Sequence, residues 1–489
     1  FEALGLPIRP DYWDTQFRFE SQISDGDRLV LVGIGALDNF DIVPPAIGDD
    51  FENFEIASRV IDNDQKSFTV GASWRRLIEG GFVTTSVSQS RSHFSFEDPG
   101  DDGIPVLAND SEELDTRLTV QGDFESRSGI TMAVGLDASR SSVEASVFQR
   151  SIPGGALTED LAWDEGVVLH KLSAFAQTTV DLGSRVKLTG GLRADEVSTL
   201  DNGFEFSPRG SVLIDLGSGV TAQAGGGLYH QAPSLIALSV KDNGRPLNLS
   251  LRQQRNVQVA SGVSWTVNQG FRLSAEAFWK EYSRVPLLVS DPRVSVSNLG
   301  GDYGFVGAEP LMDDGTGRAR GLEIFAQQKL LQNAYFLGAY TLSWSEFAGR
   351  DGGLRPSAWD RRHALDLTGG YRVGSWEFGS KLRALSGLAT TPWDIVASEQ
   401  SYAITGRGVP DWTRLGEVRT PEYVRLDARI ERRLDFSAWN AVLFLDVQNI
   451  LNRENAVGFA YTEDPAFENR IRPIDGSGLL PTFGFSIEF

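Results

Sequence analysis

The chain has 489 residues with 52 glycines, 10% aromatic residues and no cysteine, which excludes thiol catalysis, thiolate metal sites and a disulfide framework. Its net charge of −21 would repel phosphate backbones, so nucleic acid is excluded as a partner. No apolar run reaches the roughly 18 residues of a membrane-spanning helix. Residues 1–6 lack the basic region and apolar core of a signal peptide, so we expect a processed or incomplete chain.

Apolar and polar residues alternate with period two along nearly the whole chain, which predicts β-strands. At the C-terminus, for example, Phe483, Phe485 and Ile487 share one face, opposite Gly484 and Ser486. The pattern predicts 19 strands, beginning near Tyr12, Leu29, Ser67, Phe82, Glu113, Ile130, Val167, Val186, Phe204, Val220, Asn256, Phe271, Thr316, Ala334, Arg361, Ser375, Tyr423, Trp439 and Leu480. Strands of roughly 10–15 residues suit a tilted membrane crossing better than a sandwich or propeller, where strands average about 5–6 residues.

Predicted connections alternate between tight turns and long loops. The turns lie at 25–27, 79–81, 128–129, 183–184, 217–219, 268–270, 332–333 and 374–375. The long loops lie at 41–65, 97–111, 142–165, 230–253, 286–315, 389–421 and 453–478, with shorter ones near 198–203 and 349–359. This asymmetry is typical of outer-membrane barrels, which have short periplasmic turns and long extracellular loops.

The predicted fold class is therefore all-β, a large antiparallel transmembrane β-barrel. Residues 1–11 would belong to an extracellular loop and residues 12–489 to the barrel, with the C-terminus in the periplasm. Because single-chain bacterial barrels have even strand numbers, the odd count predicts that an odd number of strands lies upstream.

Several motifs resemble the C-terminal barrel of TonB-dependent outer-membrane receptors. They are 447–455 (VQNILNREN), 319–324 (ARGLEI), 360–363 (DRRH), 206–209 (FSPR), 229–234 (YHQAPS) and the terminal aromatic Phe489. The resemblance implies a barrel of about 22 strands with an N-terminal plug and a TonB-binding segment. Neither of these two parts is recognisable in the sequence, and three strands would be missing. The implied function is energised uptake of a siderophore, cobalamin, a glycan or a peptide into the periplasm.

The implied partners are outer-membrane lipid, lipopolysaccharide, the TonB complex, the barrel-assembly machinery and a surface lipoprotein lid. Candidate substrate-binding residues are Tyr229, His230, Gln231, Trp393 and Trp412. Charged residues predicted to face the lumen, hydrate it and hold the plug are Arg193, Asp195, Arg425, Asp427, Arg429 and Glu431. The predicted signal for barrel insertion consists of Phe485, Ile487 and Phe489.

The sequence gives little support for metal binding, enzyme catalysis or phosphate binding. The histidines, His93, His170, His230 and His363, show no metal-ligand spacing, and no G-x-S-x-G motif occurs, so no metal, cofactor or enzyme activity is predicted. The acidic loop residues Asp98, Asp101, Asp102, Asp110, Asp313 and Asp314 are better explained as solvated charge than as a calcium site. Residues 225–227 (GGG) lie within a strand pattern, which favours close strand packing over a phosphate-binding loop.

Three functions remain open at this point. They are a TonB-dependent transporter, a passive channel without a plug, and a structural or adhesive outer-membrane component built on the same fold. The full precursor sequence and the conductance of the isolated chain would separate them.

Overall fold

A single large antiparallel sheet dominates the computed structural model, which describes residues 8–42, 62–99, 104–126, 129–151, 160–242, 244–299, 309–331, 333–476 and 478–488. The sheet has 20 strands, of which β17 (Arg355–Pro356) is a two-residue piece beside the end of β16, leaving the 19 long strands that the sequence predicts. They are β1 (Ile8–Ser24), β2 (Asp27–Ile42), β3 (Asp62–Ile78), β4 (Gly81–Pro99), β5 (Pro105–Ser126), β6 (Ile130–Gln149), β7 (Leu161–Leu182), β8 (Val186–Val197), β9 (Phe204–Gly217), β10 (Val220–Gln231), β13 (Gln254–Thr266), β14 (Phe271–Leu288), β15 (Leu311–Leu331), β16 (Ala334–Ala348), β18 (His363–Val373), β19 (Trp376–Leu385), β24 (Tyr423–Asp435), β25 (Asn440–Gln448) and β28 (Leu480–Glu488).

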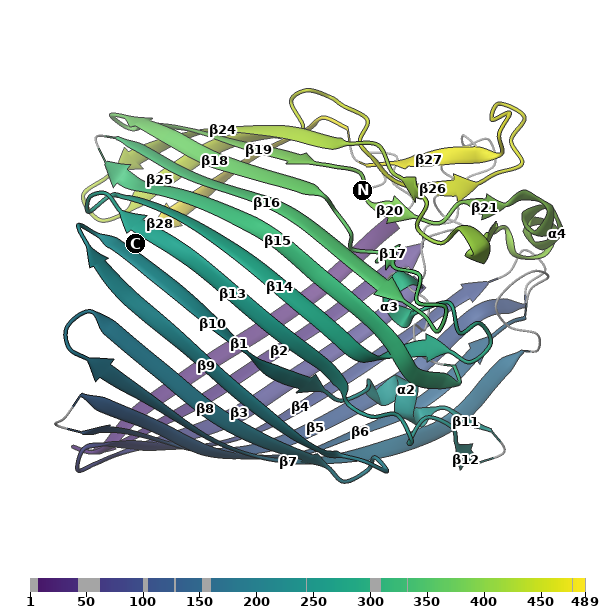
Figure 1. Ribbon diagram of the computed structural model, residues 1–489. Coiled ribbons are helices and arrows are strands. Elements are labelled where there is room, and N and C mark those ends of the chain that lie inside the picture. The colour runs from purple at the N-terminus through teal and green to yellow at the C-terminus, as the bar shows by residue number, and fades with distance from the viewer. Residues whose placement is uncertain are drawn as a thin grey trace.

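Long strands that are consecutive in the chain pair with each other. Figure 1 shows the sheet curling around one axis, with the purple and blue strands β1–β6 behind the teal and green strands β9–β16. Within the described ranges, β1 pairs only with β2 and β28 pairs only with β25, so the sheet keeps two unpaired edges. The predicted antiparallel architecture is confirmed, and a closed ring is not seen among these strands.

The two faces of the sheet differ in chemistry. On β28, Phe483 and Phe485 are 87% and 72% exposed, and on β8 Leu188 and Leu192 are also exposed. Charged residues such as Arg193 and Asp195 occupy the alternate positions of β8 and so point to the other face. An exposed apolar face and a charged opposite face are what a membrane barrel requires, because lipid covers the outside and water fills the inside.

Tight turns gather at one end of the strands and long connections at the other (Figure 1). We call these the turn end and the loop end. At the turn end, Gly80 and Gly183 have φ values of 76° and 70°, a left-handed conformation that side chains with a Cβ rarely adopt. At the loop end, the connections contain four short helices, α2 (Leu235–Ser239), α3 (Val296–Leu299), α4 (Ile395–Thr405) and η2 (Trp412–Arg414). They also contain four small strand pairs: β11 (Lys241–Asp242) with β12 (Arg245–Pro246), β20 (Ala389–Thr390) with β23 (Val418–Arg419), β21 (Trp393–Asp394) with β22 (Val409–Pro410), and β26 (Ala456–Tyr461) with β27 (Ile471–Asp475).

No helix in the described part of the chain is long and apolar enough to cross a membrane.

The predicted loops 97–111 and 142–165 are wrong in extent, because strands β4–β7 continue through most of them. β6 runs on to Gln149 and β7 begins at Leu161. In this region Val143, Ala145 and Val147 are buried, while Glu144 and Ser146 between them are exposed. The two-residue period therefore persists, but the polar positions had made the segment resemble a solvated loop. The first strand also begins at Ile8, so the described residues 8–11 belong to β1.

Residues 225–227 confirm the prediction of close strand packing. A Cβ placed at Gly226 would lie 2.8 Å from the carbonyl oxygen of Gln258, and one at Gly227 would lie 2.8 Å from the Cβ of Arg209. Both neighbours belong to strands that pair with β10, so the backbones approach more closely here than a side chain permits.

We expect Gly226→Ala to lower the free energy of unfolding by about 1–3 kcal/mol, the usual cost of forcing a carbon atom into filled space. Gly190→Ala on β8 is the matched control, since a Cβ there meets no atom within 4 Å. That control should be neutral or stabilise by up to about 1 kcal/mol. Urea unfolding in lipid vesicles, followed by tryptophan fluorescence, measures both, and equal effects at the two positions would contradict the packing argument.

Candidate functional site

The connections at the loop end pack together into one structure. We call it the loop layer, formed by the described parts of 232–253, 289–310, 349–362, 386–422 and 449–479. Its largest apolar cluster joins three connections and two strand ends through Ala237, Leu251, Leu288, Val294, Leu311 and Leu415, with Val296, Leu299 and Trp412 packed against them. A second cluster joins α2 and the residues after it to the extended strands β6 and β7 through Val143, Ala145, Val147, Trp163 and Val240. Burial of this apolar surface holds the loop layer together.

Segment 386–422 contacts several other parts of the structure. Trp412 and Leu415 join it to the largest apolar cluster. The Tyr402 ring lies 5.4 Å from that of Tyr461 in segment 449–479, and the Arg407 guanidinium lies 2.6 Å from the Asp98 carboxylate at the end of β4. The segment therefore contacts elements from distant parts of the sheet, and the Asp98 carboxylate reaches it from a strand more than three hundred residues earlier.

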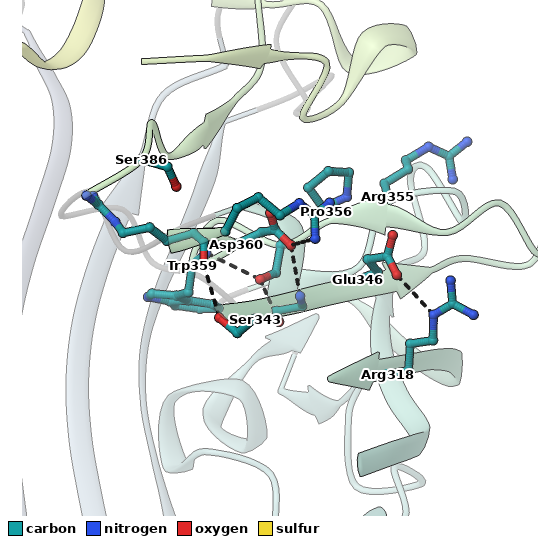
Figure 2. Close-up of polar contacts among 12 residues, drawn as sticks. Arg318, Ser343, Glu346, Arg355, Pro356, Trp359, Asp360 and Ser386 are labelled. Carbon is teal, nitrogen blue, oxygen red and sulfur yellow. Dashed lines mark hydrogen bonds and ion pairs between the residues drawn. The ribbon is translucent and has the colours of Figure 1, made fainter. Parts of the chain in front are cut away.

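A buried carboxylate fastens this segment to its neighbour. The side chain of Asp360, which is 0% exposed, accepts hydrogen bonds from the Ser345 backbone N–H at 2.8 Å and from the Arg419 guanidinium at 2.5 Å, and lies 3.2 Å from the Arg362 guanidinium (Figure 2). Arg419 also donates to the backbone carbonyls of Asp360 and Gly387, both at 3.0 Å. Asp360 thus connects β16, segment 349–362 and segment 386–422. Asp360 and Arg362 both belong to the DRRH motif that was identified in the sequence at residues 360–363.

Three carboxyl groups of the loop layer, those of Asp351, Asp291 and Glu309, have shifted pKa values. A hydrogen bond from Arg355 lowers the pKa of Asp351, and one from Arg293 lowers the pKa of Asp291. Burial raises the pKa of Glu309 to about 6, because a charged carboxylate is poorly solvated there.

His230, from the YHQAPS motif, closes a gap in the sheet. The ladder between β9 and β10 ends at the pair Gly227 and Arg209. Beyond it, His230 Nδ1 lies 3.0 Å from Ser207 Oγ, and Nε2 lies 3.1 Å from Glu205 Oε2. The His230 side chain is only 2% exposed. Glu205 also pairs with Arg284, which has a left-handed φ of 57° at an irregularity in β14. Side-chain contacts therefore replace the missing backbone bonds.

The other candidate substrate-binding residues lie in different surroundings. The Arg209 guanidinium lies 5.2 Å from the Tyr229 ring centroid, and Gln231 is exposed at the end of β10. Trp393 lies against Gly408, where a Cβ would come within 2.9 Å of the ring. Trp412 packs in the cluster that contains Ala237 and Leu251. The structure thus places both tryptophans in the loop layer, beside residues that hold it together, and the substrate-binding role stays a prediction.

The candidate lumen-facing charges pair along their own strands. The ion pairs are Arg193 with Asp195 at 2.9 Å, Arg425 with Asp427 at 2.7 Å, and Arg429 with Glu431 at 2.9 Å. Asp195 also accepts a hydrogen bond from Ser173 at 2.6 Å and lies 3.4 Å from Lys171. The sequence pattern did not identify Lys171, Ser173 or Arg284 as members of these networks, since their partners lie on other strands.

The remaining predicted residues have simpler surroundings. Phe485 and Ile487 are exposed on the apolar face of β28, and Phe489 lies outside the described residues, as do Asp101 and Asp102. Asp110 lies near His93, Asp313 pairs with Arg252, and Asp314 pairs with Arg350. In the described portion of the chain, no three His, Asp or Glu side chains gather in a way that could hold a metal ion.

We expect Asp360→Ala to loosen the loop layer, because it leaves the half-buried guanidinium groups of Arg362 and Arg419 without the buried carboxylate that binds them. The local cost should be about 3 kcal/mol. Hydrogen exchange followed by mass spectrometry should show faster exchange in 349–362, in 386–422 and at Ser345 of β16, whose N–H donates to Asp360, and unchanged exchange in the other long strands. Asp351→Ala is the matched control, since the Asp351 carboxylate is 34% exposed, in contrast to that of Asp360, and its pair with Arg355 should contribute less than about 1 kcal/mol. Equal exchange in the two variants would contradict the fastening role of Asp360.

Comparison with known proteins identifies the family. The model for the β-barrel of TonB-dependent receptor-like proteins matches residues 5–450. No curated protein sequence matches this chain significantly. Among solved structures, the ferric-catecholate import receptor Fiu from K12 E. coli superposes with a TM-score of 0.68 at 10% identity, covering 98% of this chain and 75% of that one.

Other solved structures agree. A variant of the ferric enterobactin receptor PfeA from Pseudomonas aeruginosa gives a TM-score of 0.67 at 14% identity, covering 98% of this chain and 69% of that one. The ferric citrate transporter FecA gives 0.68 at 12% identity, covering 99% and 70%. These similarities show the fold, and the family consists of receptors and transporters rather than enzymes. The chain belongs to the TonB-dependent receptor β-barrel family.

Proposed function

We propose that the chain forms the barrel of an outer-membrane transporter that uses TonB to take up a scarce nutrient into the periplasm. The observation that carries the proposal is the curled antiparallel sheet, with an apolar outer face, charged pairs on the inner face and a folded loop layer at one end only. Such a wall keeps its backbone bonded in lipid while leaving a wide hydrated interior.

Completion of the ring is part of the proposal. The outer edges of β1, which has 17 residues, and β28, which has 9, carry backbone groups with no strand partner in the described residues. Each unsatisfied group costs several kcal/mol in lipid, so these edges favour further strands between them. Three additional strands would give the 22 that the family resemblance implies. A plug inside this ring would face the charged pairs at Arg193, Asp195, Arg425, Asp427, Arg429 and Glu431.

The orientation follows the rule for outer-membrane barrels. We assign the turn end to the periplasm and the loop end to the cell exterior. The end of β28 then lies on the periplasmic side, and the exposed Phe485 and Ile487, with Phe489, would be recognised by the barrel-assembly machinery. The loop layer would meet the substrate first, and a surface lipoprotein lid would cover this same end.

The proposed substrate belongs to one of four classes, which are siderophores, cobalamin, glycans and peptides. Three of the superposed structures are described as receptors or transporters for ferric catecholates, ferric enterobactin and ferric citrate, and another is a copper transporter. This favours a metal complex among the substrate classes. Tyr229, His230, Gln231, Trp393 and Trp412 are the residues proposed to contact it.

The test is uptake of radioactive iron presented on a panel of ferric siderophores. Cells that express the full-length protein should accumulate iron from at least one complex, and deletion of TonB should abolish this accumulation. Cells that lack the protein but keep TonB are the control. Uptake that persists without TonB would overturn the proposal in favour of a passive channel. Binding at the cell surface with no uptake of any complex would overturn it in favour of a structural component.

A further inference from the structure

Four side chains, three of them from the middle of β14, β15 and β16, form an alternating row of rings and cations. The Arg320 guanidinium on β15 lies 5.5 Å from the ring centroid of Trp279 on β14 and 5.4 Å from that of Trp344 on β16. The Arg362 guanidinium also lies 5.3 Å from the ring centroid of Trp344. Each Arg–Trp contact is attractive because the electron-rich ring face stabilises the cation.

The strand register places three of these side chains side by side across the sheet. Trp279 lies directly opposite Arg320, and Arg320 lies directly opposite Trp344. On β15, Leu322 and Ile324 follow Arg320 at two-residue intervals toward the turn end and are 37% and 39% exposed. These positions share the outer apolar face of the sheet with Arg320. On the outer face of β15, Arg320 is therefore the first cation that follows these apolar residues in the direction of the loop end.

The carboxylates near the row are already engaged. Glu281 accepts a hydrogen bond from Trp279 Nε1 at 2.7 Å, which also holds the indole in place. Glu346 lies 3.0 Å from the Nε of Arg318, the next outer-face residue of β15 toward the loop end. Asp360 is bound by Arg362 and Arg419. Across the described ranges, Arg320 has ring contacts and no carboxylate partner.

We propose that Arg320 binds a phosphate group on the headgroup of an outer-leaflet lipid. This inference relies on the assignment of the apolar face to the membrane and of the loop end to the cell exterior. At that level, headgroup phosphates meet the barrel just above the hydrocarbon, where tryptophans also concentrate. A guanidinium can donate two parallel hydrogen bonds to one phosphate, and the flanking indoles hold its plane in position. Arg320 thus holds a lipid headgroup against the outer face of the sheet between β14 and β16.

The test compares lipid retained by the full-length protein after purification from outer membranes in mild detergent. Native mass spectrometry would count bound lipid A after addition of lipid A or of its dephosphorylated form. We expect Arg320→Gln to reduce lipid A binding about fivefold, the effect of one interfacial charge, while leaving the weaker binding of the dephosphorylated form unchanged. Arg318→Gln is the matched control, because this residue lies on the same strand and face but is already paired with Glu346. It should bind lipid A nearly as the natural protein does.

Competition by inorganic phosphate and a gel assay of folding complete the test. An excess of inorganic phosphate should not displace the lipid, because the site requires the phosphate and the acyl chains together. Heat-modifiable mobility on gels would verify that each variant is folded. Equal lipid A binding by Arg320→Gln and the natural protein, equal losses in the two variants, or displacement by inorganic phosphate would overturn the proposal. Iron uptake is measured separately, so failure of the lipid site and failure of the transport function give different results.

Discussion

The constraint on which the structure depends is that every backbone N–H and C=O in lipid must find a partner. The antiparallel ladder between chain neighbours meets this requirement strand by strand, from β1 to β28. It also dictates the surface chemistry, since side chains alternate across the ladder and one face must suit hydrocarbon. Phe483 and Phe485 on the outer face and the ion pairs of β24 on the inner face follow from this single arrangement. Where the ladder stops between β9 and β10, His230, Ser207 and Glu205 take over with side-chain bonds.

The loop layer follows a different principle, because its connections lie beyond the long strand ladder and form a core of their own. Its clusters bury leucine and valine side chains from several connections, and Asp360 and Arg419 fasten two of those connections. The extended strands β4–β7 supply a wall against which α2 packs. The loop end of the sheet therefore carries a preassembled surface. In the proposed transporter, a substrate would meet this surface before it reaches the inner wall.

The number and position of the strands could be predicted because their alternation is local and repeats at every strand. The ends of β4–β7 were harder to predict, since polar residues such as Glu144 and Ser146 occupy the exposed positions there and make the strand end look like a loop. The irregularity in β14 carries no such local sign. Arg284 takes a left-handed conformation there, after which Val285 and Leu287 become buried at odd positions, whereas Trp279 is exposed at an odd position before it.

The candidate site was predicted less completely. The motif around His230 and the charges of β8 and β24 were found, because they belong to patterns along one strand. Their partners Glu205, Lys171 and Ser173 come from neighbouring strands, and the contact of Arg407 with Asp98 joins residues that are far apart in the chain. Pairings of this kind depend on how the sheet curls, which no short stretch of sequence determines.

The most direct test of the account is the sidedness of the two ends in living cells, which the absence of cysteine makes simple to measure. Single cysteines at Gln400 on α4 and at Ser375 in the turn between β18 and β19 would be treated with a maleimide on a polymer too large for porins. We expect labelling of Gln400→Cys in intact cells and of Ser375→Cys only after the outer membrane is broken. The reverse pattern, or equal labelling of both positions in intact cells, would contradict a barrel that spans the outer membrane with its loop layer outside.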